Sequence, residues 1–146
     1  MKRALLILGL GLGGCESSTQ PASPSAAQQQ DNGGVRLALL QPSGASNAAE
    51  VAGNLHVEGA CLYISQGPGR KTLPAFTIPD IRWDSHQNAL LVGQSRYRAG
   101  ERVLLSGAPP FEGQKLDWMQ PPDASCDVSS IVIVGSVTRE AAAGPS

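Results

Sequence analysis

Cysteine and histidine are the residues of this sequence best suited to covalent or metal chemistry, and both are scarce. The chain has three cysteines, Cys15, Cys61 and Cys126, and two histidines, His56 and His86. Structural zinc sites place their ligands in close pairs such as Cys-x-x-Cys, and this sequence has no such pair. A metal site would require the fold to bring these distant residues together. We therefore predict no metal and no cofactor, and we expect both histidines at the surface.

The sequence also lacks the common catalytic motifs. It has no Gly-x-Ser-x-Gly turn, no phosphate-binding glycine loop before a lysine in a folded segment and no His-Glu-x-x-His. We expect no catalytic residues and no enzyme activity. A competing hypothesis is a small hydrolase, which would need Asp80, Asp84 and Asp117 to converge in a pocket with His86. Trp83 beside these acids could mark a carbohydrate-stacking cleft, but a half-buried tryptophan explains it more simply.

The start of the chain is typical of an export signal. Lys2 and Arg3 precede a run from Ala4 to Leu12 with no charged or polar side chain and no proline. A cationic start followed by a short apolar run is the pattern of a signal peptide. At about 1.5 Å per residue, a helix of this length covers only about half of the ~30 Å hydrocarbon core of a bilayer. We therefore predict a cleaved signal over residues 1–14 and not a membrane span.

The next residues, Leu12-Gly13-Gly14-Cys15, resemble the lipobox of bacterial lipoproteins. The resemblance covers Met1 to Cys15 and implies cleavage between Gly14 and Cys15, with a diacylglyceryl group on the Cys15 thiol. Two or more long acyl chains give stable anchoring where one chain is marginal. The resemblance implies a lipid-anchored protein of the cell envelope. Because Glu16 follows the cysteine, the sorting rule for such proteins favours the periplasmic face of the outer membrane in a Gram-negative host.

The rest of the chain divides into a linker, a folded domain and a tail. Beyond the cysteine itself, residues 15–34 contain no aliphatic side chain larger than alanine, so we expect a disordered linker of roughly 25 Å root-mean-square length. Residues 35–49 stay unassigned, because Val35 to Leu40 fits either a strand or the end of the linker. We predict a β domain over 50–137 and a disordered tail over 138–146.

The two cysteines of the predicted domain favour a disulfide. Once Cys15 carries lipid, Cys61 and Cys126 remain, and an even number of cysteines in an exported chain is what a disulfide framework requires. The bond would join the proline-rich loop over 107–126 to the strand that begins at Cys61. Two free buried thiols, an intermolecular bridge and a metal site remain as alternatives.

Alternation of apolar residues predicts a β-hairpin at the start of the domain. Apolar and polar or small residues alternate over 51–58, and Gly59-Ala60 then precedes a second extended run over 61–64. A two-residue turn would place Leu55 opposite Ile64 on the core side and His56 opposite Tyr63 on the outer side. The remaining pairs would be Val57 with Leu62 and Glu58 with Cys61.

Shorter extended segments follow this hairpin. The sequence predicts an extended run over 72–78 that Pro74 interrupts. It also predicts a hairpin of 81–83 with 89–92 around a polar turn, and a strand over 102–106. The strongest strand signal lies over 128–137, which is apolar on both faces and should therefore be central or covered.

These segments predict an all-β fold of five to six short strands. Low aromatic content (4%) and low charged content (16%), with 17 glycines and 11 prolines, agree with short strands and many turns. The region from Glu50 to Val137, including Tyr97 to Gly107, resembles a small OB-type barrel. It is also similar to uncharacterised small bacterial lipoproteins with a Gly-x-Leu…Cys-Leu opening. A small open β-sandwich is the alternative.

The charge of the chain argues against a nucleic-acid partner. The net charge is −1, and loss of Lys2 and Arg3 leaves 9 basic residues against 12 acidic ones, or −3. An OB-type binder of single-stranded nucleic acid needs a basic groove with aromatic residues, and it is the least favoured alternative. We expect two basic clusters, Arg70 with Lys71 and Arg96 with Arg98 and Arg102, to be solvated rim charges.

The two-faced apolar character of residues 128–137 favours a non-enzymatic domain for binding or assembly. The partners we expect are the membrane, through the lipid anchor, and another envelope protein, an envelope polymer or a small ligand. The resemblance of the fold does not itself identify the partner.

Overall fold

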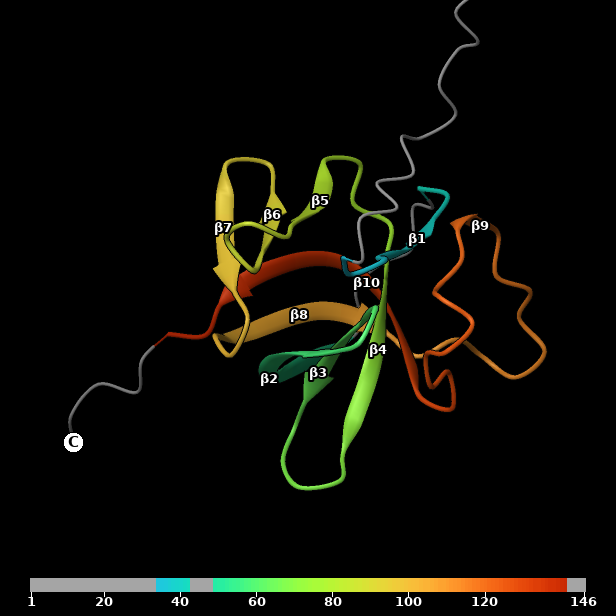
Figure 1. Ribbon diagram of the computed structural model, residues 1–146. Coiled ribbons are helices and arrows are strands. Elements are labelled where there is room, and N and C mark those ends of the chain that lie inside the picture. Colours follow the sequence, from blue (N-terminus) through green and yellow to red (C-terminus); the bar gives the residue numbers. More distant parts are fainter. Residues whose placement is uncertain (1–33, 43–48, 142–146) are drawn as a thin grey trace, which may run out of the picture.

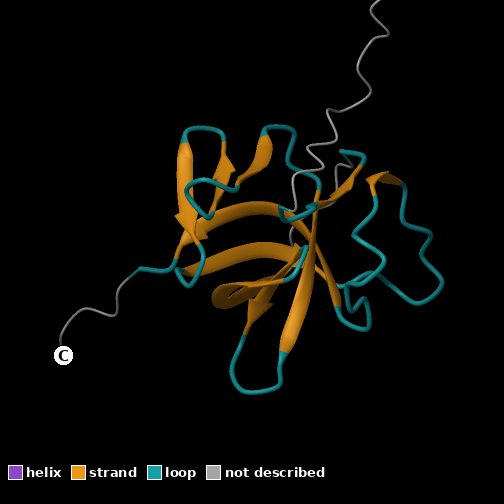
Figure 2. Ribbon diagram, viewed as in Figure 1, coloured by secondary structure: helices purple, strands orange, loops and turns teal. Residues whose placement is uncertain are grey.

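The computed structural model describes residues 34–42 and 49–141. The predicted signal over 1–14, Cys15, the linker up to residue 33 and the end of the predicted tail, 142–146, lie outside these ranges. All regular secondary structure in the described ranges is β, in ten strands without a helix (Figure 2). The strands are β1 Ala38–Leu40, β2 Ala49–Glu58, β3 Cys61–Ser65, β4 Lys71–Phe76, β5 Ile81–Asp84, β6 Ala89–Val92, β7 Ser95–Arg98, β8 Arg102–Ala108, β9 Trp118–Gln120 and β10 Ile131–Arg139. The prediction of an all-β fold is confirmed.

Five of these strands close into a barrel (Figure 1). β2 pairs antiparallel with β3 and β8, β3 with β4, and β8 with β10. β4 and β10 run parallel and close the ring. The order β2-β3-β4-β10-β8 around the ring, with one parallel pair, is the arrangement of an OB-type barrel. The predicted segments cover these five strands as well as β5 and β6, but not β1, β7 or β9 of the described chain.

The first hairpin has the predicted register. Leu55 pairs with Ile64 and His56 with Tyr63 across β2 and β3. β2 is shared between two neighbours, since its first half pairs with β8 and its second half with β3. Gly53 lies where the two halves meet, and a Cβ there would approach the Ser65 carbonyl oxygen to 2.6 Å. The bend of β2 therefore requires glycine at this position.

The barrel interior is filled by side chains at alternate positions of the five strands. Leu55 and Ile64 point inward as predicted and are fully buried. The other interior residues of the barrel strands are Leu62, Phe76, Val103, Leu105, Val132, Val134 and Val137. Side chains two residues apart on a strand share one face, and this period holds along the interior residues except in β10, where the register shifts between Val134 and Ser136.

β4 continues through Pro74, which corrects the predicted interruption. The backbone N–H groups of Leu73 and Thr77 donate to carbonyl groups of the β10 segment, at 2.8 and 2.9 Å. Backbone N–H groups alternate in direction along a strand, so the nitrogen of Pro74 points away from β10 and toward the β3 side of β4. The pairing of β3 with β4 ends at Ile64 and Thr72, before Pro74 is reached. No hydrogen bond is lost there, so this edge position tolerates proline.

β5, β6 and β7 form a small antiparallel sheet, which we call the meander. It connects β4 to β8 and lies across one end of the barrel (Figure 1). Leu90 and Tyr97 extend from it into the interior cluster, and the Tyr97 hydroxyl donates to the Val137 carbonyl at 2.9 Å. The β5–β6 hairpin was predicted, whereas β7 was not.

The folded domain extends beyond the predicted limits of 50–137. β1 lies in the stretch left unassigned over 35–49, pairs parallel with the end of β4 and antiparallel with β9. Leu37, just before β1, is buried in the interior cluster. β10 continues to Arg139, so the prediction that 138 and 139 belong to a disordered tail is wrong. Both corrections reflect strand pairing with distant partners, which local sequence does not reveal.

Candidate binding surface

The usual binding face of an OB-type barrel is covered in this protein. OB-type barrels bind oligonucleotides and oligosaccharides on the face of their second and third strands and on the adjoining loops. Here those strands are β3 and β4. Four of their outward side chains, Cys61, Tyr63, Leu73 and Ala75, are buried in a second hydrophobic cluster. β1, the β8–β10 connection (residues 109–130) and the outward residues Ile131 and Ile133 of β10 supply the rest of this outer cluster.

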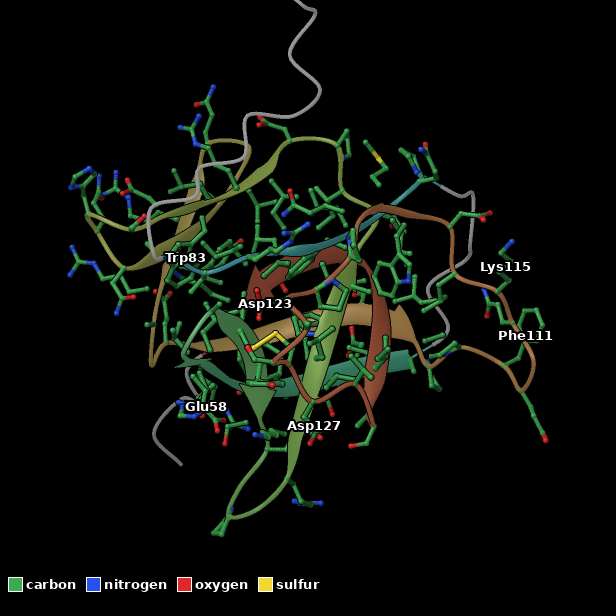
Figure 3. The ribbon with its side chains drawn as sticks, turned by 45° about the vertical axis from the view of Figure 1, so that its right-hand side comes forward. Glu58, Trp83, Phe111, Lys115, Asp123 and Asp127 are labelled. Atoms are coloured by element: carbon green, nitrogen blue, oxygen red, sulfur yellow. A yellow bond between two sulfur atoms is a disulfide. The ribbon has the colours of Figure 1, made fainter. Side chains whose placement is uncertain are left out.

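A disulfide fastens the connection to the barrel. Cys61 and Cys126 are bonded, with their Cα atoms 5.6 Å apart, as the sequence predicted. Close to this bond, the Asp127 backbone N–H donates to the Tyr63 hydroxyl at 2.7 Å. Figure 3 shows the disulfide at the centre of this face, with Asp123 and Asp127 nearby. The connection is therefore held on the barrel by a covalent bond and a buried side chain.

Tyr63 contradicts the prediction that both residues of its pair face solvent. His56 is a surface residue, with 52% of its side chain exposed, but Tyr63 is only 2% exposed. The connection covers the tyrosine, and the ammonium group of Lys71 lies 4.5 Å from the centre of its ring. The strand register correctly gave the direction of the side chain but carried no information about what covers it.

Two short Asp-x-Ser turns shape the connection around Cys126. The Asp123 carboxylate accepts hydrogen bonds from the backbone and hydroxyl of Ser125, at 2.9 and 2.6 Å, and Asp127 accepts from the Ser129 backbone at 2.9 Å. The Ser125 hydroxyl, then its backbone, lowers the pKa of Asp123, and Ser129 lowers that of Asp127 in the same way. Both carboxylates therefore stay charged at neutral pH, and they give the connection an acidic surface.

The connection also presents the large apolar side chains that are exposed in the described ranges. These are Phe111 at 72%, Met119 at 57% and Val128 at 51% exposure. Phe111 lies at a tight turn, where its backbone N–H donates to the Gln114 side chain at 3.1 Å. Phe111 and Lys115 point away from the barrel (Figure 3). The sequence predicts a long loop here, and the exposure of these apolar residues was not predicted, although an aromatic residue in a proline-rich loop was a usable signal.

The residues of the hydrolase hypothesis are not brought together. Asp84 ends β5 and accepts hydrogen bonds from the backbones of His86 and Gln87, at 3.0 and 3.1 Å, so it stabilises a turn of the meander. Asp80 directly precedes β5 of the meander, whereas Asp117 directly precedes β9, and Figure 1 shows β5 and β9 in different parts of the molecule. Trp83 is half-buried and packs against the interior cluster. In the described ranges, no three His, Cys, Asp or Glu side chains are grouped as a metal site would require.

No protein-family model, curated protein or solved structure matches this chain. Over residues 34–42 and 49–141, no helical segment has the length and apolar character needed to cross a bilayer. Function must therefore be inferred from the chemistry of the chain itself.

Proposed function

We propose that this protein is a lipid-anchored bacterial envelope protein whose OB-type barrel is a non-enzymatic module for binding another envelope protein. The observation that carries the proposal is the exposure of Phe111, Met119 and Val128 on a connection that a disulfide fixes to the barrel. An exposed apolar patch on a protein surface often marks a binding site, and these three exposed side chains all belong to the connection. Fixing them in advance reduces the entropy that a partner must overcome on binding.

The alternatives have weaker support. A nucleic acid would meet the outer cluster in place of an open groove, and the connection that covers this cluster carries the carboxylates of Glu112, Asp117, Asp123 and Asp127. A hydrolase would need acids that act together, but Asp84 and Asp123 stabilise turns, and Asp80 and Asp117 belong to different parts of the fold. A protein partner with an apolar pocket and basic rim suits the connection better than either.

The anchor in this proposal is lipid on Cys15, after cleavage behind Gly14. Metabolic labelling with an alkyne fatty acid tests it, with Ser17→Ala as a neighbouring control. We expect Cys15→Ser to lose the label and to release the domain from membranes, and Ser17→Ala to behave as the wild type. Undiminished labelling of Cys15→Ser would refute the anchor.

Site-specific photocrosslinking in intact cells tests the binding surface. A photoreactive amino acid at position 111 should crosslink to one envelope protein, and the same residue at position 68 should not, because Pro68 lies exposed in the β3–β4 turn away from the connection. Phe111→Ala should reduce a crosslink formed from position 119 without unfolding the protein, since Phe111 is mostly exposed. Equal yields from positions 111 and 68 would rule out the connection as the binding surface.

A further inference from the structure

The outer face of the meander is basic. Strand pairing places Arg82, Leu91 and Arg96 in one row across β5, β6 and β7. Leu90 and Tyr97, the residues next to Leu91 and Arg96, point into the barrel, so this row points outward. Two strand spacings separate the arginines by about 10 Å, with Leu91 between them. Arg98 lies on the same face, two residues beyond Arg96. It belongs to the next row across the three strands, which consists of Asp84, Ala89 and Arg98.

These arginines are free of ion pairs with the described part of the chain. The ion pairs there use Lys71 with Glu58, Arg102 with Glu140, Arg139 with Glu101, and His56 with Glu58 when that histidine is protonated. Arg82, Arg96 and Arg98 are all exposed. The structure thus regroups the basic residues predicted as rim charges, because Arg102 pairs elsewhere and Arg82 joins Arg96 and Arg98. Three guanidinium groups remain available to an anionic partner.

The same chain carries a surface of the opposite kind. The connection has four carboxylates and one lysine, together with the exposed apolar residues Phe111, Met119 and Val128. The meander and the tip of the connection lie on different sides of the barrel, as the positions of Trp83 and Phe111 show (Figure 3). A single molecule therefore cannot bring its two surfaces together, but two copies can.

We propose that the basic face of the meander in one copy binds the acidic, apolar connection of a second copy. An exposed apolar side chain of the connection would contact Leu91, and the flanking arginines would pair with its carboxylates. This inference rests on the proposed function of the connection and names its partner. Because the two surfaces differ, the contact is head-to-tail and leaves one surface free at each end of a dimer. Lipid anchoring on one membrane would raise the local concentration of copies.

Charge reversal combined with sedimentation velocity tests this contact. The protein is the mature chain, residues 15–146, with Cys15→Ser so that lipid does not cause association. We expect concentration-dependent association that weakens at least about tenfold between about 50 and 300 mM salt. Arg82→Glu, Arg96→Glu and Arg98→Glu together should weaken it at least about tenfold, as should Glu112→Lys with Asp117→Lys. Combining both sets in one chain should restore it, whereas Arg70→Glu, in the exposed β3–β4 turn, should have no effect.

The possible outcomes separate this inference from the proposed function. A mature chain that stays monomeric at every concentration and salt, or reversals that leave association unchanged, would overturn the head-to-tail contact. If position 111 still crosslinks to a different envelope protein, the proposed function stands without the head-to-tail contact. Binding of the monomer to phosphatidylglycerol vesicles, abolished by the arginine reversals and without self-association, would assign the basic face to a lipid surface and also overturn the proposal. Circular dichroism confirms that each variant is folded.

Discussion

The barrel interior and the outer cluster under the connection bury similar apolar side chains, but different parts of the chain enclose them. The interior is surrounded by a closed ring of hydrogen-bonded strands, and the meander covers one end. The outer cluster has strands on one side only, and on the other the connection, in which only β9 is regular. Hydrogen bonds between neighbouring strands stabilise the closed ring, whereas an irregular segment must be stabilised by other interactions. In the connection these are a disulfide, Asp-x-Ser turns and the Tyr63 hydroxyl.

The largest effect should come from removing the disulfide. Replacing Cys61 and Cys126 together by alanine frees a loop of 65 residues and should lower the free energy of unfolding by about 4 kcal/mol in the chain-entropy model. Urea denaturation measures the loss, and Cys15→Ser is the control that should not change stability. Amide hydrogen exchange then distinguishes the two regions. Protection should fall more in the connection than in the barrel strands, and an equal fall in both would contradict the distinction between them.

The next largest effect should come from the barrel interior. Leu55→Ala removes a buried side chain that the surrounding strands cannot replace, so it should cost about 2 to 4 kcal/mol. The neighbouring His56→Ala should cost less than about 1 kcal/mol, because its side chain is half exposed. Chemical denaturation of the two variants tests the register directly, since the reverse order of stabilities would place His56 inside the barrel.

The difference between the regular barrel strands and the irregular connection explains how much of the fold could be predicted from the sequence. The Leu55–Ile64 and His56–Tyr63 pairs followed from alternation and a two-residue turn, because these partners are neighbours in the chain. The Cys61–Cys126 bond followed from counting cysteines. Burial of Tyr63 did not follow, because its cover is a connection that is distant in the sequence and whose path has no periodic pattern. β1 and its pairing with β4 were missed for the same reason, since so short a strand carries almost no local signal.

For the candidate surface, the sequence provided less. It supplied the loop, the overall negative charge and the resemblance of Leu12 to Cys15 to a lipobox, but not which residues share a face. Arg82 joined Arg96 and Arg98 only because β5 and β7 both pair with β6. Strand register decides which arginines share a surface, whereas proximity along the chain suggested Arg96 with Arg102 instead.

A smaller effect should come from the Tyr63 hydroxyl, compared with that of Tyr97. Tyr63→Phe leaves the Asp127 N–H without its acceptor, and we expect a cost of about 1 to 2 kcal/mol. Tyr97→Phe removes a donor to the Val137 carbonyl and should cost about 0.5 to 1 kcal/mol. Denaturation gives both values, and hydrogen exchange at Asp127 should accelerate only in Tyr63→Phe. Unchanged exchange there would mean that this hydrogen bond does not fasten the connection.

The smallest effect should come from Glu101, which joins the end of the meander to the end of β10. Its carboxylate accepts from the Arg98 backbone N–H at 3.0 Å and pairs with Arg139 at 2.7 Å. The Arg98 backbone N–H, then Arg139, lowers the pKa of Glu101 below its ordinary value of 4.5. A carboxyl with a lowered folded-state pKa stabilises the fold above its unfolded pKa and loses this contribution as pH falls through the folded value.

Glu101→Gln should therefore cost about 0.5 kcal/mol at pH 7, since the pair is near the surface and glutamine still accepts a hydrogen bond. The difference from the wild type should shrink as the pH falls below 4.5 and vanish once the wild-type carboxyl is protonated. Urea denaturation of both proteins from pH 7 to about pH 2.5 measures it, and the subtraction cancels the titration of Asp123 and Asp127, which both proteins share. If the difference in the free energy of unfolding stayed constant with pH, the effect of glutamine would come from disturbed packing. The charge of Glu101 would then not stabilise the contact between the meander and the barrel. The Glu101 contacts therefore join two segments whose positions the strands already fix. The disulfide, in contrast, itself fixes the position of the connection.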